Sequence, residues 1–297
     1  MTRAQVTLLP DKQRLHLQDG PIDLVIEAFG RPQSMRAAYA AAAARFAAIL
    51  DELCAELPLL RARAVPEGHT LKGPIARRMW AAVAPFARES FITPMAAVAG
   101  AVAEEVLSTM VAAAPLSRAY VNNGGDIALH LAPGTRIAVG MVNRPDQPAL
   151  LGTATLHAEQ PVRGIATSGW RGRSFSLGIA DAVTVLADTA AQADAAATVI
   201  ANAVNLPAHP GIRRARASEL QPDSDLGRLL VTREVPRLAP SDVQIALAAG
   251  LACAERARER GLIIAAALHL QSRTLLLGAA EPRALQSTKA EWRCAHA

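Results

Sequence analysis

The stretch VNNGGDIAL places polar turn residues between two segments that favour β-structure. The apolar pattern is interrupted by Asn122, Asn123, Gly124, Gly125 and Asp126, residue types that strands disfavour. Consecutive glycines let the backbone adopt positive φ and come close to a ligand. Asn-Gly is also the strongest short signal for a tight hairpin. A bare hairpin turn and one wall of a ligand site are therefore both open interpretations.

A second polar stretch, GIATSGWRGRSFSLG over 164–178, combines hydroxyls, glycines and arginines. The stretch places Thr167, Ser168 and Ser174 among Gly169, Gly172 and Gly178, with Arg163, Arg171 and Arg173 close by. Backbone N–H groups freed by glycine, together with hydroxyls and guanidinium groups, suit a phosphate or a carboxylate. The alternative is a basic surface turn in which Trp170 only packs. The stretch is not a P-loop, because GxxxxGK[ST] is absent.

The third candidate is a pair of residues, Asp194 and Thr198, with helical spacing. A separation of four residues puts both side chains on one face of a helix, one turn apart. Their oxygens suit a hard cation such as Mg²⁺, completed by backbone or phosphate oxygens. The alternative is a solvated Asp and a Thr that bonds back to its own helix.

Other residues that could do chemistry carry weaker signals. The histidines are scattered, without HxH or HExxH spacing, and Ser168 is not in a GxSxG elbow. Cys54, Cys253 and Cys294 lie far apart without a CxxC pair, which fits a reducing compartment. The sequence therefore does not predict a hydrolase triad or a cysteine metal cluster.

Composition limits the class of protein. The 297 residues are 51% hydrophobic and only 3% aromatic, which favours a folded, alanine-rich protein. A net charge of +5 permits an anionic ligand but does not predict nucleic acid, which usually requires a clustered basic face. No signal peptide and no run of 18 uninterrupted apolar residues is evident, so we expect a cytoplasmic protein without a membrane segment.

The elements expected to position these residues alternate between helices and strands. The predicted helices cover 35–57 with Ser34 as N-cap, 74–89, Thr93 to Pro115, about 189–204 with Asp188 as cap, and 241–260. The predicted strands cover 13–29 as a hairpin, 118–122, 126–131, 136–142, 151–157, 164–168, 182–187, one near 228–234, and a closing hairpin over 262–279. The rest of 206–240 is expected to be irregular. The fold class is α+β, mainly antiparallel, with packed helices, in one domain over 1–297; two lobes are the alternative.

The three polar motifs also occur in a diagnostic order. VNNGGDI, IATSG and a T-V strand followed by ADAAAT resemble the ApbE-like superfamily, whose best-known members are Mg-dependent FAD:protein FMN transferases. The resemblance is strongest over 90–205 and implies the T-fold-like ApbE architecture of mixed, mainly antiparallel sheets. It also implies that Asp194 and Thr198 hold Mg²⁺. The segments PIDLVIEAFG and FITPMAAVAGAVAEE look like an uncharacterised UPF branch of the superfamily rather than the transferases.

Two departures separate this chain from the transferases. The family's lysine before the helix glycine is Ala99 here, with Gly100 at the glycine. The family's H-x-x-D-P-x-T-G segment corresponds to 173–181, which has neither His nor Pro. Flavinylation of a target protein is therefore not expected, although a transferase is the class that the resemblance implies.

The sequence leads to one expected function and one rival. We expect a small phosphorylated or anionic ligand, with FAD or FMN as candidates, to bind at 122–126, 167–169, Arg171 and Arg173, with Mg²⁺ on Asp194 and Thr198. The rival is a non-catalytic or sulfur-transfer partner in sulfide and homocysteine metabolism, with a vestigial flavin site. The reaction and a homo-oligomeric state are left open.

Overall fold

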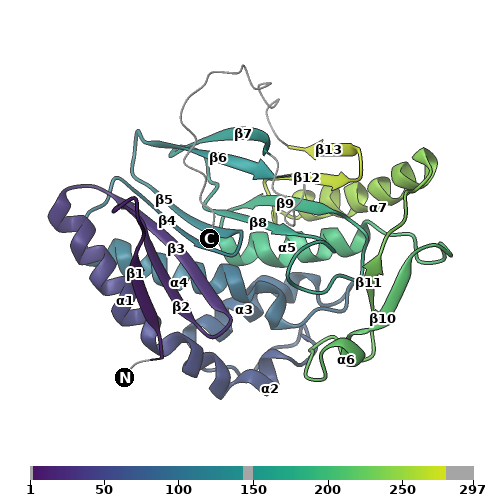
Figure 1. Cartoon of the computed structure of the whole chain (residues 1–297), viewed down its shortest axis with the longest axis horizontal. Helices are drawn as coiled ribbons and strands as arrows, with labels where there is room; N and C mark the ends of the chain where they lie inside the picture. Colours follow the sequence, from purple (N-terminus) through teal and green to yellow (C-terminus); the bar gives the residue numbers. More distant parts are fainter. Residues whose placement is uncertain (1–2, 143–149, 279–297) are drawn as a thin grey trace.

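The computed structural model describes residues 3–142 and 150–278. Its largest element is a nine-stranded sheet in which all paired strands run antiparallel (Figure 1). In spatial order the strands are β1 (Gln5–Leu8), β2 (Leu15–Asp19), β3 (Ile22–Phe29), β4 (Arg118–Asn123), β5 (Asp126–Leu131), β8 (Gly164–Ser168), β9 (Ala182–Ala187), β12 (Ala265–Leu270) and β13 (Arg273–Leu277). One sheet thus joins strands from both ends of the described chain, and the predicted mainly antiparallel α+β class is confirmed.

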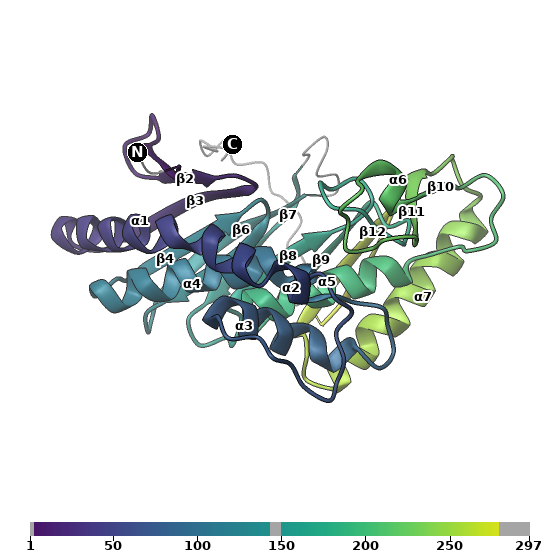
Figure 2. The ribbon, with the colours of Figure 1, turned by 90° about the horizontal axis from the view of Figure 1, so that it is seen from below.

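Most helices gather on one face of this sheet (Figure 2). They are α1 (Pro32–Ala55), α2 (Leu57–Leu60), α3 (Pro74–Val83), α4 (Val98–Ala113), α5 (Ala190–Ala203) and α7 (Pro240–Glu259), with 3₁₀ turns η1 (Ala84–Phe86) and η2 (Pro94–Ala97). The short helix α6 (Ala217–Leu220) instead lies beside β10 (Arg213–Arg216). Helix α4 packs on β4 and β5, and α5 packs on β8 and β9. Alternate strand residues therefore point into this layer: Ala119 and Val121 of β4 are fully buried there.

The other face of the sheet is covered at its centre by a separate hairpin. Strands β6 (Arg136–Val142) and β7 (Leu150–His157) pair antiparallel and form their own sheet. Under it lies a second apolar cluster that includes Leu129, Leu156 and Ile165. Each buried side chain of this size contributes roughly 1.5–3 kcal/mol by leaving water. The central strands are therefore buried on both faces, which holds their ends in fixed relative positions.

Helices α4 and α5 cross in backbone contact. A Cβ added to Gly100 would lie 2.5 Å from the carbonyl carbon of Ala190 and 2.7 Å from the nitrogen of Ala191. The surrounding residues Ala97, Ala101 and Ala193 are fully buried and small. Small side chains on both helices therefore bring the first turn of α4 against the first turn of α5.

Several predicted boundaries are wrong. Helix α1 begins at Pro32, and its N-cap is Arg31 rather than Ser34, since proline with its preset φ occupies the first turn. Helix α5 is capped by Thr189, whose Oγ1 accepts a hydrogen bond from Gln192 N at 3.2 Å, rather than by Asp188. The helix predicted over 74–89 ends at Val83 and continues only as a 3₁₀ turn.

Two strands, β1 and β10, are absent from the prediction. Residues 213–216, RRAR, form β10, which pairs antiparallel with β11 (Leu230–Glu234). Three arginines in four residues show no apolar alternation, so local sequence carries no strand signal here. The pairing with β11, a tertiary contact, decides the conformation.

The segment Pro94–Ala113 is long and apolar enough to cross a membrane by length and composition alone. In this structure its residues Val102, Val106 and Met110 are fully buried against neighbouring helices and strands. Packing in the protein core accounts for its apolar composition. The expectation of a single domain over the whole chain stays a prediction.

Candidate functional site

The Asn122–Asp126 segment is a two-residue hairpin turn. Asn123 pairs with Asp126 across β4 and β5, and Gly124 and Gly125 have φ of 64° and 114°. Positive φ at both central positions is what a type I′ turn requires, so glycine is explained by backbone geometry. The Oδ1 of Asn122 accepts a hydrogen bond from Gly125 N at 2.8 Å and closes the turn. The hairpin interpretation is therefore correct for the backbone.

The side chains of Asn123 and Asp126 nevertheless point towards the helices that carry the other candidate residues. Asn123 lies on the helix-covered face, is only 8% exposed, and donates from Nδ2 to the Ala99 carbonyl oxygen at 3.1 Å. Asp126 follows on the same face and accepts a hydrogen bond from Thr167 N at 3.3 Å. The turn is thus connected to the start of α4 and to the end of β8, where the T-S-G motif lies.

Asp194 of α5 reaches the same place. Its Oδ2 accepts a hydrogen bond from Gly100 N at 3.0 Å, in the first turn of α4. The N-cap residue of α4, Ala97, has no side chain that could accept such a bond. Asp194 therefore caps a different helix from the one that carries it. This contact replaces the alternative of a freely solvated carboxylate, and the alanine-rich sequence around Asp194 has no signal for it.

Asp126 and Asp194 both have raised pKa values. Burial raises the pKa of Asp126 to about 7, against the opposing effects of the Thr167 N–H and the positive charge of Arg173. Burial also raises the pKa of Asp194 well above its ordinary value, and the negative charge of Asp126 raises it further. The backbone N–H groups of Gly100 and Ala99 act in the opposite direction. Two neighbouring half-buried carboxylates with raised pKa values favour a shared proton or a bound cation.

The raised pKa of Asp126 predicts how stability depends on pH without metal. The folded state holds this proton up to about pH 7, whereas an ordinary carboxyl loses it near 3.8. The free energy of unfolding should therefore fall as pH rises between these values, because the folded state binds more protons there. In EDTA, Asp126→Asn should lose less stability over this range than the wild type, measured by urea unfolding at several pH values. The exposed Asp188→Asn is the control; parallel wild-type and Asp126→Asn profiles would contradict the assignment.

The donor set fits a hard cation. Asp126 and Asp194 supply carboxylates, and Thr198 lies one helical turn beyond Asp194 with a half-buried hydroxyl that makes no hydrogen bond to the described residues. Among the described residues no three His, Cys, Asp or Glu side chains converge on a metal site. A cation here would therefore need hydroxyl, backbone or ligand oxygens besides the carboxylates, which is the coordination that Mg²⁺ prefers.

The T-S-G motif ends strand β8 beside this pair. Ser168 shares the helix-covered face with Ala166, is half-buried, and its hydroxyl makes no hydrogen bond to the described residues. Thr167 points to the opposite face, where its Oγ1 lies 2.9 Å from Thr184 Oγ1. A Cβ on Gly169 would lie 2.6 Å from the Asp181 carbonyl oxygen. Of these residues, the structure therefore leaves the Ser168 side chain facing the site.

The two arginines after T-S-G have different environments. Arg171 Nε donates to Asp181 Oδ1 at 2.6 Å, and its guanidinium lies 4.4 Å from the ring centre of Trp170. Asp181 is only 3% exposed and also accepts bonds from Trp170 Nε1 at 3.1 Å and Gln271 N at 2.5 Å. The Arg171 charge is thus matched inside the protein. Sequence reasoning missed Asp181, whose one signal was a carboxylate within an apolar strand-like run.

Arg173 instead covers the hairpin turn. Its guanidinium carbon lies 2.7 Å from the position that a Cβ on Gly124 would occupy. The residue is exposed and makes no hydrogen bond or ion pair with the described residues, while its charge lowers the pKa of Asp126. Glycine at 124 therefore makes room for a guanidinium that is available to an anion beside the two carboxylates.

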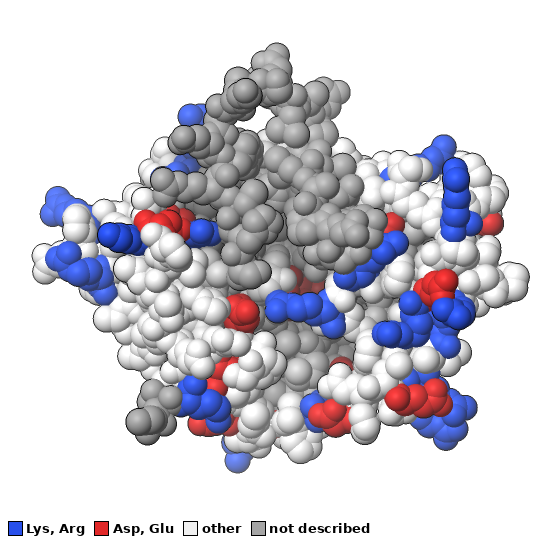
Figure 3. Space-filling model, viewed as in Figure 1, with Lys and Arg blue, Asp and Glu red and all other residues white. Residues whose placement is uncertain are grey.

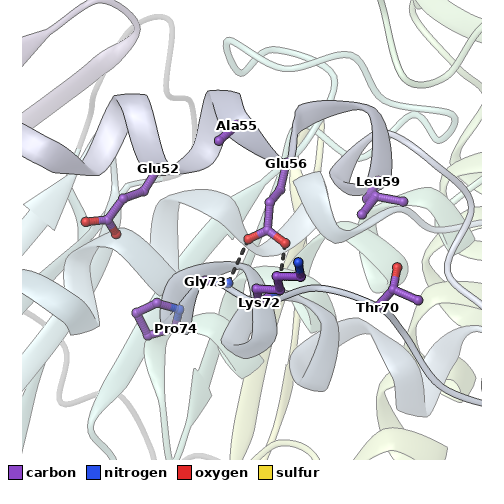
Figure 4. Close-up of a pocket in the computed structure, with 8 residues that line it drawn as sticks. All are labelled: Glu52, Ala55, Glu56, Leu59, Thr70, Lys72, Gly73 and Pro74. Atoms are coloured by element: carbon purple, nitrogen blue, oxygen red, sulfur yellow. Dashed lines mark hydrogen bonds between the residues drawn. The ribbon is translucent and has the colours of Figure 1, made fainter.

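One cavity lies away from the candidate site, and the pattern of surface charge does not mark the site. A cavity of 510 Å³ lies between the end of α1 and the start of α3, where Glu56 accepts hydrogen bonds from the backbone of Lys72 and Gly73 (Figure 4). On the face viewed in Figure 3, acidic and basic side chains are interspersed rather than gathered in one basic patch. The candidate site is therefore defined by converging polar groups at strand ends, and not by this cavity.

The described cysteines are outside the site. Cys54 is exposed on α1, and Cys253 is half-buried on α7, where burial raises the pKa of its thiol. A raised pKa disfavours the reactive thiolate. Cys294 lies outside the described residues. Nothing in these contacts favours the sulfur-transfer rival.

Comparison with known proteins agrees with the motif order. A family model described as AbpE bacteria matches residues 6–281. A UPF0280 protein of Methanopyrus kandleri is 39% identical over 155 residues, covering 52% of this chain and 59% of that protein. A UPF0280 protein of Methanococcoides burtonii is 40% identical over 126 residues, covering 42% and 51%. The chain thus spans little more than half the length of these relatives.

A solved structure was also found. The apo form of the flavinyl transferase ApbE of Pseudomonas stutzeri aligns with a TM-score of 0.34 and 14% identity, over 86% of this chain and 78% of that one. At this level no residue role can be transferred. The family match and the UPF0280 relatives confirm the resemblance to an uncharacterised ApbE-like branch.

Proposed function

The chain belongs to the AbpE bacteria family, and on that basis we propose that it binds a small phosphorylated ligand together with Mg²⁺ at the ends of β4, β5 and β8. One observation carries the proposal. Two neighbouring carboxylates with raised pKa values, Asp126 and Asp194, lie beside the exposed guanidinium of Arg173. Negative and positive groups placed side by side in this way suit a cation and an anion bound together.

Different residues would bind the cation and the phosphate. Asp194, Thr198 and Asp126 would hold Mg²⁺, which supplies positive charge to phosphate oxygens. Arg173 would pair with the phosphate, and the ligand could approach the backbone at Gly125, where an added Cβ would meet no atom within 4 Å. Ser168 would add a hydroxyl donor. Arg171, which is paired with Asp181, would hold the loop rather than the ligand.

Flavin nucleotides are the ligands we propose first, because the family is ApbE-like. Transfer of FMN to a protein is not part of the proposal, since residues 173–181 contain neither His nor Pro. The proposed ligands are therefore FAD, FMN or a simpler nucleotide such as ADP, and we also propose a cytoplasmic location.

Calorimetric titration of the full chain tests this function. FAD, FMN and ADP should each be titrated with Mg²⁺ and again in EDTA. The expected result is saturable binding of at least one of them that weakens when Mg²⁺ is removed. No binding of any of the three with Mg²⁺ present would overturn the proposal.

Arg173→Ala should weaken binding of the phosphorylated ligand. A charge-assisted hydrogen bond contributes about 1.5–3 kcal/mol, so the dissociation constant should rise roughly 10- to 100-fold. The fold should be unaffected, because Arg173 is exposed and bonds to no described residue. Arg36→Ala, an exposed arginine in the first turns of α1, removes the same charge elsewhere. Equal affinities for both variants would show that Arg173 does not contact the anion.

A further inference from the structure

Helices α4 and α5 cap each other. Asp194 of α5 accepts from Gly100 N in the first turn of α4, and Glu104 of α4 accepts from Ala191 N in the first turn of α5 at 2.7 Å. The first N–H groups of any helix lack partners within that helix. Each of these two helices therefore obtains one missing acceptor from a carboxylate on the other.

Glu104 is itself held in place. Its Oε2 lies 3.0 Å from Arg78 Nε of α3, and its side chain is 19% exposed. Arg78 also donates to the Ala101 carbonyl oxygen at 3.3 Å, so it is bonded to the same turn of α4. The carboxylate of Glu104 is thus oriented on one side by a guanidinium and on the other by the backbone of α5.

Glu104 contacts α5 at Ala191, about one helical turn before Asp194. Ala191 precedes Asp194 by three residues, which places both in the same first turns of α5. At this crossing the backbones of α4 and α5 touch at Gly100 and Ala190. A shift in the start of α5 would therefore move the Asp194 carboxylate relative to Asp126, which is carried by the sheet.

We infer that Glu104, oriented by Arg78, is a positioning residue for the cation site, because it fixes the turn of α5 that carries Asp194. This inference rests on the proposed function. Glu104 does not contact the cation; it sets the distance between two carboxylates on different elements. Residues that orient metal ligands without touching the metal typically change affinity by roughly 10- to 100-fold when removed.

The test is Mn²⁺ affinity of the full chain, measured by electron paramagnetic resonance. Glu104→Ala should bind Mn²⁺ roughly 10-fold more weakly than the wild type. Glu104→Gln keeps an oxygen acceptor for Ala191 N and should restore affinity close to that of the wild type. Glu52→Ala is the control, since Glu52 of α1 bonds to Arg45 and to neither Arg78 nor α5.

The outcomes distinguish the positioning role of Glu104 from the existence of the cation site. If Glu104→Ala fails to fold by circular dichroism, Glu104→Asp decides, since it keeps the charge but is one methylene shorter. Unchanged Mn²⁺ affinity in a folded variant, or an equal loss in Glu52→Ala, would overturn the positioning role. Absence of Mn²⁺ binding by the wild type would instead overturn the cation site of the proposed function.

Discussion

Asp194→Asn is expected to lower the affinity for Mg²⁺ or Mn²⁺ by about 100-fold or more, since cation affinity in oxygen sites follows the number of charged ligands. The amide keeps an oxygen that can accept from Gly100 N, so the cap on α4 is retained. Removing one of two neighbouring negative charges also relieves repulsion with Asp126. In EDTA at pH 8 the variant should therefore be at least as stable as the wild type.

Calorimetric titration with Mn²⁺ and urea unfolding in EDTA check the two parts of this prediction. Asp188→Asn, an exposed Asp just before α5, is the control for the loss of one carboxylate. Asp194→Ala distinguishes the helix-capping role of Asp194 from its cation-binding role. It removes the hydrogen-bond acceptor for α4 as well as the charge, and should cost about 1 kcal/mol of stability. Mn²⁺ affinity of Asp194→Asn equal to that of the wild type would show that Asp194 only caps α4.

The largest expected effect on stability comes from Gly100→Ala. In an ordinary helix this change would stabilise by up to about 1 kcal/mol. Here the new Cβ would lie 2.5 Å from the Ala190 carbonyl carbon, and this neighbour is backbone that cannot rotate away. Overpacking costs about 1–3 kcal/mol, and we expect the upper end of this range because the neighbour is backbone. After the helix gain, the expected net loss is about 2 kcal/mol.

Urea unfolding measures that loss. Gly30→Ala is the matched control, because its Cβ would lie 3.4 Å from the nearest atom, which is ordinary contact, so no comparable loss is expected. Because α4 and α5 would be forced apart, Gly100→Ala should also weaken Mn²⁺ binding. Stability equal to that of the wild type would mean that the helices do not cross in backbone contact.

Much of the fold follows from local sequence patterns. The apolar residues of 126–131, the nearly continuous apolar run of 182–187, and turn residues such as Gly124 and Gly125 correctly predicted strands and the hairpin between β4 and β5. These signals are local, because side-chain direction in a strand repeats every two residues. Strand β10 has no such local signal, because its arginines do not alternate with apolar residues. It was therefore missed, since only its long-range pairing with β11 makes it a strand.

The site was predicted less completely than the fold. The motif order indicated which segments carry polar chemistry, but it treated Arg171 and Arg173 alike. The structure separates them, since Arg171 is paired with buried Asp181 and Arg173 covers Gly124. Nor does residue type reveal that Asp194 accepts from the backbone of Gly100, because every residue except proline has the same N–H group.

The sequence by itself determined the antiparallel α+β class, the ApbE-like family and the three polar segments, because each depends on residue types at fixed local spacing. Only the tertiary structure decided that Asp126, far from Asp194 in the chain, raises the pKa of Asp194. It also decided that Glu104 and Asp194 cap each other's helices. Burial and proximity raise the pKa of Asp194, and both depend on how α4 and α5 pack against the sheet.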